Sequence, residues 1–112
     1  MSPDEAAILD VHRFGRLALS FVSGIEWSDF ETDIRTQQAT LHALTLMGEA
    51  VKRLSSGFRE EHNQVNWGDV AGLRDVLIHS YHRVELHEVW VILMDHLPGF
   101  VEYIEPLVAR EP

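Results

Sequence analysis

Residues 67–84 read WGDVAGLRDVLIHSYHRV, and the spacing of their apolar side chains indicates an α-helix. Apolar residues recur at intervals of three, four and seven positions, at Val70, Leu73, Leu77 and Val84. Such intervals place side chains on one face of a helix with 3.6 residues per turn. The stretch is therefore expected to form one amphipathic helix of the fold, with this face toward the core.

Helical signals also fill the N-terminal half of the chain. Ser2-Pro3-Asp4-Glu5 has the spacing of a capping box, with Ser2 as the N-cap residue. An apolar stripe at helical spacing follows through residues 7–25. Ser28-Asp29-Phe30-Glu31 resembles a second capping box and predicts a short helix, which a longer helix should follow at about residues 36–55.

The C-terminal half has the same character. Residues 57–66 are polar and irregular, which predicts a loop with room for one helical turn. Glu85 is expected to cap a helix that Pro98-Gly99 ends, before a last amphipathic segment at residues 100–110. Trp67 and Trp90 are expected in the core. Because no stretch alternates with a period of two, the sequence predicts an all-α bundle of four to five helices.

Composition limits the class of protein. The 112 residues, 46% of them hydrophobic and 24% charged, suit one globular domain over residues 1–112. The chain has no cysteine, which excludes disulfides and thiolate zinc sites, and no apolar run of membrane-spanning length. Its acidic N-terminus is unlike a signal peptide, so we expect a cytoplasmic protein without a membrane partner. A net charge of −9 disfavours general coating of nucleic acids.

The face opposite the apolar stripe of residues 67–84 is polar but has an isoleucine at its centre. It carries an arginine, an aspartate and two histidines around Ile78, at Arg74, Asp75, His79 and His82. An isoleucine in such a place indicates a contact surface, so we expect a dimer interface at Ile78 and His82. On a helical wheel Arg74 and His79 diverge by ~140°. Two copies about a two-fold axis could bring these side chains to one shared cleft.

The residue types on this face suit cleavage of a phosphodiester. His79 can move protons near neutral pH, and Asp75, four residues earlier, can orient its imidazole. Arg74 can stabilise the charge that develops on phosphorus. RNA supplies its own nucleophile, the 2′-hydroxyl group, so no metal or other cofactor is needed. The alternative on the same residues is a metal site formed by His79 and His82 with Asp75 and Glu85.

The chain resembles HepT-like toxins of the HEPN superfamily. The central resemblance is Arg74-x4-His79-x-Tyr81, within the block of residues 71–79. Further similar blocks follow in the family's order along nearly the whole chain, at Ile8-Leu9-Asp10, residues 33–39, residues 47–54, Trp67 and Val89-Trp90. The chain departs from the family pattern at His42-Ala43, where relatives commonly carry Arg-Asn, and at Glu85, where aspartate is frequent.

The resemblance implies a HEPN-type helical bundle that forms a homodimer, with a metal-independent endoribonuclease site in the dimer cleft. Arg74 and His79 would be its catalytic residues. It also implies a type II toxin–antitoxin pair with an MntA-like nucleotidyltransferase antitoxin, which silences the toxin by transferring AMP to Tyr81. The alternative is a non-catalytic helical dimer that binds and regulates a partner nucleotidyltransferase. The RNA target and the identity of the antitoxin do not follow from the sequence.

Overall fold

The computed structural model describes residues 1–79 and 86–108, with residues 74–79 described by their backbone alone. Every regular element of this part is helical, which confirms the all-α prediction. The long helical segments are α1 (Pro3–Phe21), α3 (Ile34–Lys52), α5 (Trp67–His79) and a continuous run formed by α6 (Leu86–Val91), a π-helical turn (Ile92–His96) and α7 (Leu97–Ile104). Shorter elements are α2 (Trp27–Thr32), α4 (Ser56–Glu61) and a 3₁₀ turn (Glu105–Leu107).

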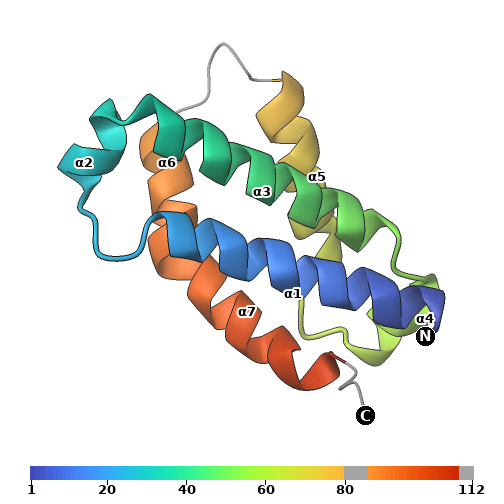
Figure 1. The fold of residues 1–112 in the computed structure, drawn as a ribbon. Helices are drawn as coiled ribbons and strands as arrows, with labels where there is room; N and C mark the ends of the chain where they lie inside the picture. Colours follow the sequence, from blue (N-terminus) through green and yellow to red (C-terminus); the bar gives the residue numbers. More distant parts are fainter. Residues whose placement is uncertain (80–85, 109–112) are drawn as a thin grey trace.

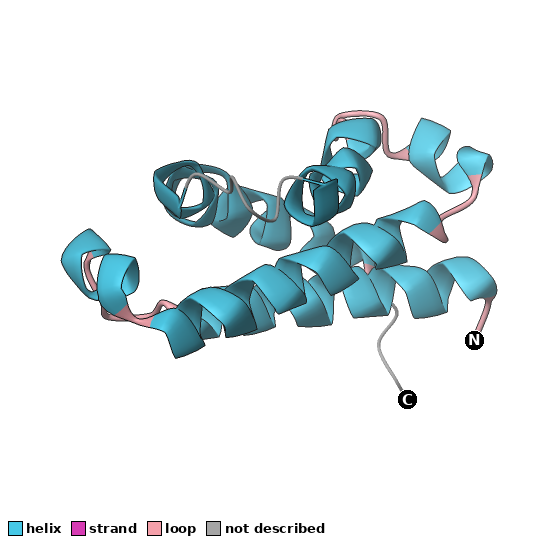
Figure 2. Cartoon of the chain, turned by 90° about the horizontal axis from the view of Figure 1, so that it is seen from above, coloured by secondary structure: helices cyan, strands magenta, loops and turns pink. Residues whose placement is uncertain are grey.

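The centre of the bundle is α3, which packs against α1 on one side and α5 on another. Figure 1 shows α1 and α3 running in opposite directions, with α7 crossing next to α1. Figure 2 shows α5 and α6 together on one side of the layer that α1 and α3 form. Fully buried side chains from three helices meet between these layers, among them Ile8, Leu44 and Leu93. None of the described helices has the length and apolarity that a membrane crossing requires.

Two helix starts test the predicted capping residues. Ser2 is the N-cap of α1, and its hydroxyl group accepts a hydrogen bond from the Glu5 amide at 3.0 Å. The prediction that Ser28 opens the next helix is wrong, because α2 begins one residue earlier, with Glu26 as the N-cap. Asp29 is the third residue of α2, and its carboxylate accepts from the Glu26 amide at 2.9 Å. Glu26 thus takes the N-cap role expected of Ser28, and Asp29 takes the reciprocal role at the third helical position.

Asp33 is the residue between α2 and α3, and residues 34–39 form the first turns of α3. Asp33 caps α3, since its carboxylate accepts from the amide and the hydroxyl group of Thr36 at 3.2 and 2.7 Å. The buried amide group of Gln37 donates to the carbonyl oxygens of Phe30 and Glu31 at 2.9 and 3.1 Å. These carbonyls belong to the last turn of α2, where helical partners are missing. Gln37 therefore fixes the end of α2 against α3.

The region expected to be a loop contains α4. Ser55 is the N-cap of this helix, and the Asp4 side chain forms hydrogen bonds with Ser55. The Ser55 hydroxyl group accepts from the Phe58 amide at 3.1 Å. The Asp4 carboxylate, from the first turn of α1, accepts from the Ser55 amide at 2.8 Å and from the Ser55 hydroxyl group at 2.6 Å. Both hydrogen bonds favour the charged carboxylate and lower the pKa of Asp4.

We expect Asp4→Asn to lower the free energy of unfolding at neutral pH. The pKa of Asp4 is lowered from 3.8 in the folded chain, so its contribution is complete above that value and is lost as the pH falls through the folded pKa. Urea unfolding at pH 7 and at strongly acidic pH measures the difference, which should shrink in acid. Glu60→Gln, at an exposed carboxylate on α4, is the matched control. A difference that persists unchanged in acid would contradict the expected hydrogen-bonded charge.

The helical run from residue 86 to 104 corrects the expected break at Pro98-Gly99. Pro98 lies in the first turn of α7, where a missing amide hydrogen costs no helical bond. The preceding turn is π-helical, and the Leu97 amide donates to the Ile92 carbonyl, five residues back. This wider turn lets the chain pass Pro98 without ending the helix. The last helix therefore begins before residue 100 and ends at Ile104, followed by the 3₁₀ turn.

The contact between α1 and α7 is closest at Gly15. A methyl group built at this position would lie 2.9 Å from Val101 Cγ2 and 3.4 Å from Met47 Sδ. Because Cβ atoms do not approach other carbons to 2.9 Å, any larger residue would push α7 away from α1. The absence of a side chain at residue 15 thus sets the distance between these helices.

Candidate functional site

The helix that carries the predicted catalytic residues is firmly anchored at its start. The side chain of Asn66 accepts from the Asp69 amide at 3.1 Å and so caps α5. Trp67 is 4% exposed, as predicted for a core residue, and its indole N–H donates to the His62 carbonyl at 2.9 Å. Phe58 and Phe100 each contact the Trp67 ring at a centroid distance of 5.9 Å. Three elements therefore fix the position of α5.

The helix that follows the predicted motif is anchored in the same way, by aromatic contacts to α2. Trp90 on α6 lies 5.3 Å from Phe30 and 6.2 Å from Trp27, measured between ring centroids. His87 meets Trp27 edge to face at 5.1 Å. Trp90 packs on the core as predicted but is only half-buried. The two helices on either side of residues 80–85 are thus each fixed by a tryptophan.

Within α5, the helical backbone extends through His79 and includes Arg74, Asp75 and Ile78. Positions 75 and 79 are four residues apart, so they lie one turn from each other along the helix. Positions 74 and 79 are five residues apart and lie on different sides of it. Arg74, Asp75, Ile78 and His79 are placed by their backbone alone, and their roles stay predictions. Tyr81, His82 and Glu85 lie outside the described residues.

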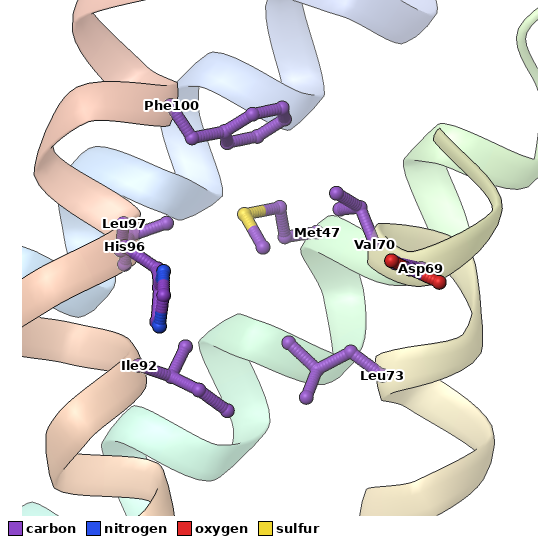
Figure 3. Close-up of a pocket in the computed structure, with 8 residues that line it drawn as sticks. All are labelled: Met47, Asp69, Val70, Leu73, Ile92, His96, Leu97 and Phe100. Atoms are coloured by element: carbon purple, nitrogen blue, oxygen red, sulfur yellow. The ribbon is translucent and has the colours of Figure 1, made fainter. Parts of the chain in front are cut away.

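A cavity of about 340 Å³ opens beside the first turns of α5, between this helix and the π-helical turn with α7. Val70 and Leu73 form one wall, and Met47 from α3 lies between the walls (Figure 3). The facing wall consists of side chains from the π-helical turn and α7, at Ile92, His96, Leu97 and Phe100. Val70 and Leu73 belong to the apolar stripe of α5, so the cavity lies on the side of this helix that is opposite the predicted catalytic face.

Two polar side chains line this otherwise apolar cavity. Asp69 and His96 are both exposed and come from opposite walls, as Figure 3 shows. The cavity has no signal in the sequence, because its walls come from three separate stretches, each with an ordinary core pattern. The expected break at Pro98 also concealed that Ile92 and Phe100 belong to one continuous helical run. No local motif signals Asp69 or His96.

The chain is similar to several ribonucleases in its sequence. The family model described as "Ribonuclease HepT-like" matches residues 12–107. A "Putative RNase" of Caldanaerobacter subterraneus subsp. tengcongensis is 36% identical over 90 residues, which cover 80% of each chain. A "Putative RNase" of Methanocaldococcus jannaschii is 33% identical over 80% of this chain and 74% of its own. A "Probable ribonuclease HepT" of Thermococcus cleftensis is 32% identical over 88% of this chain and 89% of its own.

No solved structure matches the chain. The family model nevertheless includes all of α3 and α5 and the run from α6 to α7, and so spans both the helix with the Arg-x4-His positions and the walls of the cavity. The relatives cover most of this chain and are themselves covered for most of their length. The resemblance seen in the sequence is therefore confirmed: the chain is an enzyme of the ribonuclease HepT-like family, within the HEPN superfamily.

Proposed function

We propose that this protein is the toxin of a type II toxin–antitoxin pair and cleaves RNA without a metal ion, with Arg74 and His79 as catalytic residues. The observation that carries the proposal is the family match over residues 12–107, which includes the Arg-x4-His-x-Tyr sequence. Support comes from the fold, since this sequence begins on a helix that Trp67 and Asn66 fix at its start. Such anchoring suits a site that must hold reacting groups in position.

The chemistry needs only the residues of this segment and the RNA itself. His79 removes the proton of a 2′-hydroxyl group, whose oxygen attacks the adjacent phosphorus while the bond to the 5′-oxygen breaks. The leaving oxygen takes up a proton, and a cyclic phosphate remains on the other product. Arg74 stabilises the extra negative charge on the phosphoryl oxygens, and Asp75 orients the imidazole. The test is cleavage of total RNA by the purified protein in EDTA. Loss of cleavage in EDTA would overturn the metal-independent mechanism.

We further propose that the active form is a homodimer through the face with Ile78 and His82. Positions 74 and 79 diverge by ~140° on one helix, so one copy alone aims them apart. We expect light scattering to show a dimer at micromolar concentration, and Ile78→Glu to weaken both the dimer and RNA cleavage. Ile34→Glu is the matched control, because Ile34 is an isoleucine of another helix and is 70% exposed at the start of α3. A monomer with full activity would contradict a catalytic site that is shared between two copies.

An MntA-like nucleotidyltransferase is the proposed antitoxin, with Tyr81 as the acceptor of AMP. The phenol oxygen attacks the α-phosphorus of ATP, the bond to the β-phosphate bridge breaks, and pyrophosphate leaves as the phenol loses its proton. The added group carries a negative charge and a purine, and its tyrosine lies seven residues after Arg74 in the sequence. Pairing of that phosphate with Arg74 and obstruction by adenosine would both block RNA.

The second candidate is a non-catalytic helical dimer that regulates its partner nucleotidyltransferase. One observation favours it: the net charge of −9 opposes the approach of a polyanion. The RNA assay in EDTA separates the two functions, because a binding module would leave RNA intact under every condition. Genuine cleavage that survives removal of metal would exclude it.

A further inference from the structure

We propose that the face formed by α1 and α7 binds the same face of a second copy of this chain. This face differs from the one with Ile78, because Ile78 belongs to α5. The interface does not depend on RNA cleavage, so it can exist or be absent independently of the proposed function. Its basis is a pair of oppositely charged strips that lie side by side and form no ion pair with each other.

Two exposed arginines on α1, Arg13 and Arg16, form the basic strip of this face. They lie three residues apart, so both project from one side of the helix. Residues 11–25 contain no aspartate or glutamate, although acidic residues outnumber lysine and arginine by 18 to 9 in the whole chain. Among the described residues, neither arginine has an ion pair or a side-chain hydrogen bond. Neighbouring like charges repel each other, so the basic strip favours a negatively charged partner.

The acidic strip consists of Glu102 on α7 and Glu105, the first residue of the 3₁₀ turn that follows. Both residues are exposed, and neither side chain has an ion pair or a hydrogen bond within the part of the chain that the structure describes. Residues 97–108 contain no lysine or arginine. The two strips therefore have opposite charges, and they belong to helices that pack against each other.

The strips lie at nearly the same height along the two helices. A methyl group built at Gly15 would be 2.9 Å from Val101 Cγ2, so these two residues face each other. Figure 1 shows that α1 and α7 run in opposite directions. With a rise of about 1.5 Å per residue, Arg13 is level with residue 103, and Glu102 is within ~2 Å of that level. The other two residues of the strips lie within about one helical turn of it.

Apolar surface accompanies the charges. Leu17 and Phe21 follow Arg13 at intervals of four residues along α1 and are 41% and 37% exposed. Exposed ion pairs alone contribute little to association, so a stable contact needs apolar groups of this kind. Aromatic residues and arginine are enriched in protein interfaces, where lysine is depleted. Where α1 meets α7, a hollow of about 310 Å³ is lined by Arg16, Leu19, Ser20, Ser23 and Val101.

A two-fold axis along the groove between α1 and α7 makes this face self-complementary. Such an axis keeps the height of every residue and places α1 of each copy on α7 of the other. The basic strip of one copy then meets the acidic strip of its partner, and the same contact forms twice. An axis across the helices would instead place α1 on α1 of the partner and bring arginine next to arginine.

RNA and an acidic protein fit this face less well. Either of them would be attracted by the basic strip but repelled by the acidic strip beside it. Exposed Leu17 and Phe21 also offer nothing to a phosphate backbone. A second copy of this chain is a partner that carries both charges in the reversed order.

The first experiment measures association of the full chain with Ile78→Glu, so that the interface proposed at Ile78 does not contribute. Ile78→Ala replaces this variant if circular dichroism shows that it does not fold. We expect analytical ultracentrifugation to show a monomer–dimer equilibrium that weakens as salt is added, because salt screens exposed charges. A protein that stays monomeric at low salt up to millimolar concentration would overturn the proposal.

The second experiment reverses the charge of one strip at a time in the same Ile78 variant. Arg13→Glu with Arg16→Glu makes both strips acidic, and Glu102→Arg with Glu105→Arg makes both strips basic. Each of these proteins should self-associate at least roughly tenfold more weakly, whereas an equimolar mixture should form dimers with one copy of each. Association that returns in the mixture cannot result from unfolding of either protein.

Charge reversals elsewhere are the matched controls. Arg35→Glu on α3 and Glu60→Arg on α4 change exposed residues outside both strips and should leave the association unchanged. If the reversed strips behave like these controls, or if the mixture associates no better than its components, the face does not join two copies and the proposal fails.

The third experiment tests RNA as the occupant. A fluorescent single-stranded RNA is titrated into the full chain with His79→Ala, which prevents cleavage under the proposed mechanism. We expect Arg16→Glu to change the RNA affinity no more than Arg35→Glu does, since both reverse one exposed charge. If Arg16→Glu lowers the affinity roughly tenfold more than Arg35→Glu and leaves association unchanged, the face binds RNA and not a second copy.

Discussion

His79→Ala is expected to reduce RNA cleavage by roughly 10²–10⁴-fold, the usual effect of removing a general acid or base. The sequence pattern places residue 79 opposite the apolar stripe of its helix, so the substitution should change the free energy of unfolding by no more than ~0.5 kcal/mol. The measurement pairs initial rates on a defined RNA with a thermal melt of the same preparation. Full activity in a well-folded His79→Ala protein would end the catalytic assignment.

A matched control separates the role of residue 79 from the loss of any histidine. His42 is exposed on α3, and His42→Ala should leave cleavage within a fewfold of the wild type. Arg74→Lys should be severely impaired even though the charge is kept, because a single ammonium group does not reproduce the planar fork of a guanidinium at phosphate. If His42→Ala proves as damaging as His79→Ala, the site has been placed on the wrong helix.

Co-expression with an MntA-like nucleotidyltransferase is expected to add AMP from ATP to Tyr81 and abolish RNA cleavage. The chain contains only two tyrosines, which makes the assignment by peptide mass spectrometry unambiguous. Tyr103 is the internal control, because it is 37% exposed on α7 and its hydroxyl group donates to Gln64 at 2.7 Å. The modification should be found on Tyr81 and not on Tyr103.

Two variants complete this experiment. Tyr81→Phe should escape inactivation by the transferase, whereas Tyr103→Phe should be inactivated as fully as the wild type. If the catalytic activity of the transferase still inactivates the Tyr81→Phe protein, then AMP transfer to Tyr81 is not what abolishes RNA cleavage. Removal of ATP from the reaction should leave both proteins active, because AMP transfer has no other donor.

Local chemistry made much of the helical fold predictable. Ser2 caps the first helix because a hydroxyl group next to proline satisfies an amide that no other residue reaches. The same rule failed at Ser28, because Glu26 and Asp29 form a reciprocal capping box that starts α2 before Ser28. Asp4 shows why the sequence predicts a helical turn in this region but not where α4 begins: the hydrogen bonds to Ser55 come from a residue 51 positions away. Pairings at such distance leave no pattern in the local sequence.

The candidate site also has one part that the sequence predicts and one part that it does not. The segment from Arg74 to Tyr81 is predicted from the polar face of its helix and from the resemblance to HepT-like toxins, and the roles of its residues stay predictions. The cavity could not be predicted, since Met47, Leu73 and Phe100 each fit an ordinary apolar stripe and meet only through the packing of three elements. A π-helical turn has no reliable sequence signal, so the wall that contains Ile92 and His96 emerged from the structure.

Gly15 has a consequence for how this protein can change during evolution or in the laboratory. The position contacts Val101 on α7 and Met47, which is also part of the cavity lining. A substitution there would move two of the parts that shape the cavity, although residue 15 itself never touches a ligand. A substitution at residue 15 should therefore change the shape of the cavity as well as the stability of the fold. A buried position without a side chain would then control a surface that it does not itself reach.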